Sequence, residues 1–123
     1  MTATSLDPPV SDLVAVEVTR SGATACVTAA GEIDSTSAPV LRRRLETLLE
    51  GDLEEFVVDL VQVTFLDSAG LCVLAAAHRT AAGRGIRMQV LAASRAVIRP
   101  LQITGLWSLL GASQVEADDA GVA

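Results

Sequence analysis

Residues 56–71, with the sequence FVVDLVQVTFLDSAGL, decide the fold of this chain. The stretch opens with a continuous apolar run, Phe56–Leu60, which is typical of a strand that is covered on both faces in a parallel sheet. From Ser68 the apolar positions follow helical spacing to about Ala82, and Gly83 is a helix stop. A covered strand that leads directly into a helix indicates an α/β fold. The apolar residues between them are expected to form a buried loop or strand end; they are Val63, Phe65 and Leu66.

Two strands and a helix are predicted on the N-terminal side of this stretch. Apolar residues alternate over 14–18 and again over 24–32, which indicates two half-buried strands. The turn signal Ser21-Gly22 between them predicts an antiparallel hairpin. Asp34 and the hydroxyl residues after it are helix-capping residues, so a helix is expected to begin there and to end at Gly51. Its apolar stripe consists of Leu41, Leu45, Leu48 and Leu49.

The C-terminal side contributes a strand over 86–90, a helix capped by Ser94, and a last short strand over Leu106–Leu110. Alternating strands and helices imply right-handed crossovers. We therefore expect an α/β fold with a mixed, mostly parallel sheet, an N-terminal hairpin, and helices packed on the sheet. The domain is expected over 13–112, between a flexible lead (1–12) and a flexible acidic tail (113–123).

The composition excludes several classes of function. The chain has 123 residues, which is enough for one domain. Its net charge of −6 and its three aromatic residues argue against binding to nucleic acid, which calls for a basic surface or stacking platforms. All nine basic residues are arginine, so a P-loop lysine and a Schiff-base lysine are both absent.

The sequence predicts a cytoplasmic protein. The chain does not begin with a basic segment followed by an apolar one, so no signal peptide is expected, and no apolar run is long enough for a membrane span. Cys26 and Cys72 lie in apolar segments without metal-ligand spacing. We interpret them as buried free thiols of a reducing compartment.

Ser68 is the residue that carries the most chemistry, and two interpretations of it follow from the residues alone. It lies at or next to the helix N-cap, so it could do no more than cap the helix. A hydrolase nucleophile would need a base, and the one histidine, His78, lies ten residues further along the same helix. That separation is about 15 Å, which is outside hydrogen-bond reach, so a catalytic triad within this chain is excluded.

Asp34, Asp59 and Asp67 each follow an apolar strand and could meet at one edge of the sheet, where carboxylates could hold Mg²⁺. The missing lysine and the lack of an adjacent acidic pair after the first strand count against a phosphoaspartate site of this kind. We expect no metal and no cofactor.

The helix after Ser68 is apolar nearly all round, whereas a surface helix normally has a polar face. Either it is buried between the sheet and a neighbour, or its first turns form an exposed patch of small residues for a partner. We favour the second alternative, because a small domain has little material with which to cover a helix on all sides.

Three motifs together resemble the STAS domains of the bacterial anti-sigma factor antagonists. They are Val57-Val58-Asp59-Leu60 followed by Phe65-Leu66-Asp67-Ser68-Ala69-Gly70-Leu71, the upstream Gly31-Glu32-Ile33-Asp34, and the late Ile103-Thr104-Gly105-Leu106. Their order and spacing match the family over about residues 13–112. The chain departs from the family at Cys72, where many members have glycine, and at Trp107, which we interpret as a lid on the core.

The resemblance implies a STAS fold without catalysis of its own. Unphosphorylated members bind an anti-sigma factor, often a serine kinase, and so free the sigma factor. The kinase phosphorylates the motif serine, which is Ser68 here, and a PP2C-type phosphatase resets the switch. The partner-binding residues implied by position are Asp34, Asp67, Ser68, Ala69, Gly70, Leu71 and Cys72.

Two alternatives remain open from the sequence. In the first, the chain is a monomer that forms heterocomplexes with such a kinase and binds neither nucleic acid nor membrane. In the second, it is a non-switching STAS scaffold, or a subunit of a stressosome-like or lipid-transport complex, in which Ser68 is an ordinary helix cap.

Overall fold

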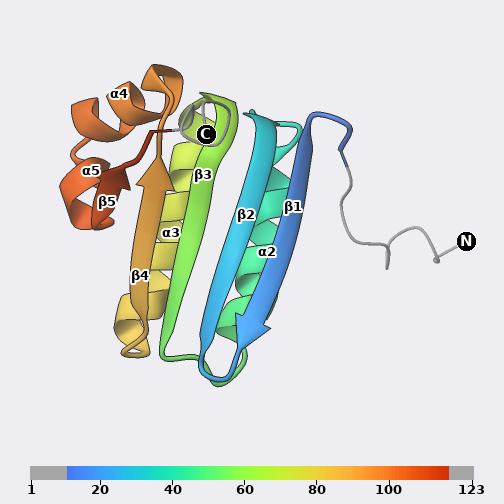
Figure 1. Cartoon of the computed structure of the whole chain (residues 1–123), viewed down its shortest axis with the longest axis vertical. Helices are drawn as coiled ribbons and strands as arrows, with labels where there is room; N and C mark the ends of the chain where they lie inside the picture. The colour runs from blue at the N-terminus through green and yellow to red at the C-terminus, as the bar shows by residue number, and fades with distance from the viewer. Residues whose placement is uncertain (1–10, 117–123) are drawn as a thin grey trace, which may run out of the picture.

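The computed structural model describes residues 11–116, which form one five-stranded sheet with helices (Figure 1). The strands lie side by side in chain order: β1 (Val14–Ser21), β2 (Thr24–Ile33), β3 (Glu55–Leu66), β4 (Arg87–Ala92) and β5 (Ala112–Gln114). β1 and β2 are antiparallel, and every other neighbouring pair is parallel. The predicted hairpin and the mixed, mostly parallel sheet are thus confirmed.

Two long helices, α2 (Ala38–Leu49) and α3 (Ser68–Gly83), cover the same face of the sheet, behind the strands in Figure 1. Two shorter ones, α4 (Arg95–Ile103) and α5 (Leu106–Leu109), lie at the edge of the sheet that is far from β1. Because each parallel pair of strands needs a crossover, the helices collect on this face and at this edge.

The core lies between the sheet and the two long helices. Alternate residues of the central strands point into it, among them Val27 and Ala29 from β2 and Phe56 and Val58 from β3. The predicted leucine stripe of α2 is buried, which confirms the helical pattern. Among the described residues, no helix covers the other face of β1, β2 and β3, and we call this the open face (Figure 1).

The prediction of a last strand over Leu106–Leu110 is wrong. Residues 106–109 form the short helix α5, because Gly105 adopts a left-handed conformation before it and the Leu110 N–H donates to the Leu106 carbonyl. The edge strand β5 comes three residues after α5, so ordered structure continues past the expected limit at residue 112. A short apolar run has no periodicity that separates a strand from a helix. Residues 1–10 and 117–123, most of the expected lead and tail, lie outside the described residues.

β3 is also longer than its apolar run predicts. It continues to Leu66 through an irregularity in its pairing with β2. Val63 and Leu66 are buried as expected, but Phe65 is exposed, since its side chain lies on the open face. Trp107 is half-buried and packs against the core, which agrees with its interpretation as a lid. In the described part of the chain, no helix is long and apolar enough to cross a membrane.

Candidate functional site

The site lies where β2 and β3 end side by side. Ile33 and Leu66 are partners in the parallel ladder, and each is followed directly by an aspartate. The Asp67 N–H donates to the Ile33 carbonyl over 3.1 Å, which joins the two strand ends. Parallel strands bring the start of the next helix to the same edge, so α2 and α3 both begin here.

Asp67, rather than Ser68, is the N-cap of α3. Its carboxylate accepts a hydrogen bond of 2.9 Å from the Ala69 N–H, and its carbonyl accepts one from the Leu71 N–H. Ser68 is the first residue of the helix and is exposed. Of the hydrogen bonds between described residues, none uses the Ser68 hydroxyl. The helix is therefore capped without the hydroxyl, which is free on the surface.

Asp34 closes a turn that precedes α2. Its carboxylate accepts from the Thr36 hydroxyl at 2.7 Å, from the Thr36 N–H at 2.8 Å and from the Ser37 N–H at 3.1 Å. The Thr36 hydroxyl has the largest part in holding the pKa of the Asp34 carboxyl below its ordinary value, and the backbone N–H groups of Thr36 and Ser37 add to this. Asp34 was expected to cap the helix itself, but the N-cap of α2 is Ser37.

Ser37 is fully buried and does not cap the helix with its side chain. Its hydroxyl donates to the Glu32 carbonyl at 2.7 Å and accepts from the Asp34 N–H at 2.9 Å. These bonds tie the end of β2 to the turn, so the backbone of Asp34 is held in place by the buried Ser37 hydroxyl.

Gly70 faces the interior of the protein. A Cβ at this position would lie 2.3 Å from Leu66 Cδ1 and 2.8 Å from Ile33 Cγ2. The glycine therefore lets α3 approach the ends of β2 and β3. Gly70 thus has a packing role in the placement of α3, and its expected role in partner binding stays a prediction. No sequence signal separates this role from a surface one, because both require a small residue.

The other predicted contact residues lie at or near the surface. Ser68 and Cys72 are exposed, whereas Asp67, Ala69 and Leu71 are half-buried. The prediction that both cysteines are buried is wrong for Cys72, because it lies on the outer side of α3, and Cys26 is half-buried.

His78 also lies on α3, so the predicted separation of about 15 Å from Ser68 along one helix is confirmed. Asp59 does not reach the site, since its carboxylate accepts from the Val61 N–H in its own strand. Within residues 11–116, no group of three or more His, Cys, Asp or Glu side chains gathers as a metal site would require.

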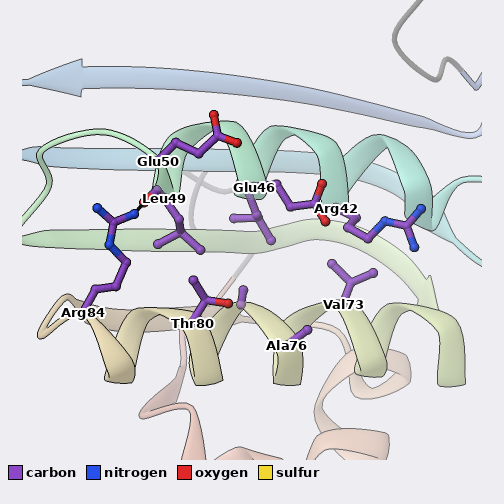
Figure 2. Close-up of a pocket in the computed structure, with 10 residues that line it drawn as sticks. Arg42, Glu46, Leu49, Glu50, Val73, Ala76, Thr80 and Arg84 are labelled. Atoms are coloured by element: carbon purple, nitrogen blue, oxygen red, sulfur yellow. Dashed lines mark hydrogen bonds between the residues drawn. The ribbon is translucent and has the colours of Figure 1, made fainter. Parts of the chain in front are cut away.

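A groove of about 300 Å³ runs between α2 and α3, with Arg42 toward one end and Arg84 toward the other (Figure 2). Arg84 donates to the Leu49 carbonyl and so ties the C-terminal ends of the two helices together. A second hollow shares Arg42 with this groove and reaches Ala69 and Cys72 near Ser68. One side of α3 is thus buried while another borders an open groove, so neither alternative for this helix holds in full.

Comparison with known proteins places this geometry in a family. Residues 16–111 match the family described as "Mlab, STAS domain", so the chain belongs to the STAS-domain family. It is 37% identical over 89 residues to the anti-sigma-B factor antagonist of Bacillus subtilis, an alignment that covers 71% of this chain and 79% of the relative. It is 30% identical over 92 residues to the anti-sigma-B factor antagonist of Listeria monocytogenes, with 75% and 81% covered.

A solved structure agrees with the fold. The anti-sigma factor antagonist from Mycobacterium paratuberculosis superposes with a TM-score of 0.77 at 30% identity, over 89% of this chain and 92% of that one. The predicted STAS fold is therefore confirmed. The named relatives belong to a class of regulatory binding proteins, the anti-sigma factor antagonists.

Proposed function

We propose that this chain is an anti-sigma factor antagonist that is switched by phosphorylation of Ser68. The observation that carries the proposal is an exposed serine at the start of α3 whose hydroxyl makes no hydrogen bond with the described residues. The unphosphorylated protein binds an anti-sigma factor of the serine-kinase type through the surface around Ser68, and the sigma factor is released. The protein acts in the cytoplasm as a monomer that forms heterocomplexes, and it needs no catalytic group, metal or cofactor of its own.

The switching step is a phosphoryl transfer. The Ser68 oxygen forms a bond to the γ-phosphorus of ATP held by the kinase, ADP leaves, and the hydroxyl proton passes to a base of the kinase. A PP2C-type phosphatase reverses the state by hydrolysis, which gives inorganic phosphate and the free hydroxyl. Asp34 and Asp67 lie at the same edge and make the surface around Ser68 acidic before phosphorylation.

The phosphate weakens binding without unfolding the protein. It adds about −1.5 to −2 charges at the N-terminus of α3, where the helix dipole favours an anion. At an interface the same charge must be desolvated beside two carboxylates. Burial of an unpaired charge there costs about 2–5 kcal/mol, so an affinity loss of about 30-fold or more is expected.

The test uses wild-type protein, Ser68→Ala and Ser68→Asp in the native cell. We expect wild type to carry a form heavier by one phosphate group that is missing from Ser68→Ala, and a protein with an ATPase-type kinase domain to copurify with Ser68→Ala but not with Ser68→Asp. Equal recovery of the same partners by both variants, without any phosphorylated form, would contradict the proposal. The non-switching scaffold would then be the better description, with Ser68 as an ordinary residue of the first helical turn.

A further inference from the structure

Three exposed side chains form a row across the open face at the end of the sheet that carries Ser68. Glu32 of β2 is the ladder partner of Phe65 of β3, and the Glu32 N–H donates to the Leu13 carbonyl over 2.9 Å on the other side. Residues that are paired across neighbouring strands point to the same face of a sheet. Leu13, Glu32 and Phe65 therefore stand side by side, and we call them the β-edge row.

The row places two large apolar side chains in solvent. Phe65 is 45% exposed and Leu13 is 40% exposed. They lie on the two sides of Glu32, about 10 Å apart by the spacing of neighbouring strands. Glu32 stands between them, so an apolar side chain of another protein would lie over its aliphatic stem and contact Phe65 and Leu13 on either side.

The position of Leu13 is fixed by the backbone. Gly31 has a φ of 112°, and a Cβ at this residue would lie 2.1 Å from the Leu13 carbonyl oxygen. Only a residue without a side chain permits this approach, so the start of β1 is held against β2. The row is consequently a preformed surface, which loses little freedom when a partner binds.

The row is continuous with the surface around Ser68, and it is acidic. Phe65 of β3 is two residues before Asp67, and Glu32 of β2 is two residues before Asp34, so both lie next to the aspartates that follow the strand ends. None of these three carboxylates forms an ion pair with a described residue, and the ion pair that is present, Arg87 with Glu55, lies at the opposite end of β3. A partner surface that matches this edge would combine an apolar side chain with arginine or lysine.

We infer that the β-edge row is the apolar anchor of the anti-sigma factor interface and receives an apolar side chain of the partner that is flanked by basic residues. The inference rests on the proposed function and assigns to Phe65 and Leu13 a role beyond the serine turn. The interface then spans two sides of the strand ends: α3 presents Ser68 on one side, and the open face presents the row on the other. A phosphate on Ser68 lies at the border of this apolar contact and prevents its closure.

The experiment uses the anti-sigma factor that copurifies with Ser68→Ala, identified by mass spectrometry and then purified. Its dissociation constant is measured by calorimetry with unphosphorylated wild type, Phe65→Ser, Leu13→Ser and Phe65→Tyr. A buried aromatic anchor commonly dominates binding, so Phe65→Ser should weaken affinity about tenfold or more. Leu13→Ser should have a smaller effect, and Phe65→Tyr should keep most of the affinity because the ring remains.

The matched control is Leu109→Ser. Leu109 is 54% exposed and lies on α5, at the other edge of the sheet (Figure 1). Its substitution removes as much exposed apolar surface but should leave the affinity unchanged. Melting temperatures of all variants check that each is folded. Glu32→Gln should weaken binding and reduce its dependence on salt, because it removes a carboxylate that would pair with the basic residues of the partner.

The outcomes separate the two proposals. If Ser68→Ala binds the kinase, Ser68→Asp does not, and a folded Phe65→Ser binds as tightly as wild type, the role of the row is overturned while the switch stands. If Phe65→Ser and Leu109→Ser weaken binding equally, the row is overturned as well. If neither Ser68 variant binds an anti-sigma factor, the proposed function fails and the role of the row fails with it.

Discussion

Two strand-to-helix turns lie next to each other in this protein, and they use the same residue types in different ways. In both turns a buried aliphatic residue is followed by an aspartate, and serine hydroxyls lie close by. After β2 the chain takes four residues, 34–37, before α2 begins, and Ser37 is buried with its hydroxyl bonded on both sides. After β3 the helix begins at once, with Asp67 as its cap and Ser68 exposed.

The difference shows how a serine becomes available for chemistry. A hydroxyl that completes a turn cannot be modified without breaking the turn, and Ser37 is in this position. At the β3–α3 turn Asp67 caps the helix, so the turn does not need a hydrogen bond from the Ser68 hydroxyl. The same helix N-terminus that would tolerate a phosphate therefore also presents the group that would accept it.

The largest effect should come from the same substitution placed in both turns. We expect Ser37→Asp to lower the free energy of unfolding by about 3–5 kcal/mol, because an unpaired carboxylate would be buried. It would also lose the donor to the Glu32 carbonyl and face the carboxylate of Asp34, which is 3.4 Å from the Ser37 hydroxyl. Ser68→Asp should stay within about 1 kcal/mol of wild type, since an exposed anion suits the first helical turn. Urea unfolding of both variants measures the difference, and equal values would remove the contrast between the two turns.

A smaller effect is expected at the close contact between α3 and the strand ends. Gly70→Ala should cost about 1–3 kcal/mol, because the new methyl group would overlap with Leu66 and Ile33 in a packed core. The control is Gly83→Ala at the other end of the same helix, where a Cβ meets no atom within 4 Å. That change should be neutral or stabilise the protein by up to about 1 kcal/mol. The two melting curves test this directly, and a neutral Gly70→Ala would mean that the contact is looser than described.

The smallest effect concerns pH. The folded protein lowers the pKa of the Asp34 carboxyl from its ordinary value of 3.8, so the ionised carboxylate stabilises the fold at neutral pH. This contribution is lost at acidic pH, as the pH falls below 3.8 and through the lowered pKa. Asp34→Asn should therefore melt below wild type at pH 7, and the gap should close as the pH falls below that value. Thr36→Val, which removes the donor with the largest influence, should reproduce part of the gap. A gap that stays constant with pH would show that the carboxylate charge is not what stabilises this turn.

Much of the fold could be predicted from the sequence because its patterns are long. The alternation in β1 and β2 and the leucine stripe of α2 each extend over two or more repeats, and all three elements are confirmed. The run at Leu106–Leu110 is only five residues long, and there the left-handed Gly105 decides in favour of a helix. Short segments are decided by tertiary contacts rather than by period.

The candidate site could be located from the sequence but not oriented. The motif indicates that Ser68 and Asp67 lie at the start of a helix, and the structure confirms this. The inward position of Gly70 and the outward position of Phe65 both depend on how β2 and β3 pair, and a single sequence contains no direct signal of register. The exposure of Cys72 was missed for a similar reason, since an apolar helix does not reveal which of its sides meets the sheet.

The hydrogen bond from Asp67 to Ile33 has a consequence for the order in which the chain assembles. The β1–β2 hairpin is local and can form early, whereas the pairing of β2 with β3 must wait for the crossover through α2. The frame around Ser68 therefore does not exist in a partly synthesised or partly folded chain. An enzyme that recognises this frame, rather than a linear peptide, would act only on molecules that have completed folding.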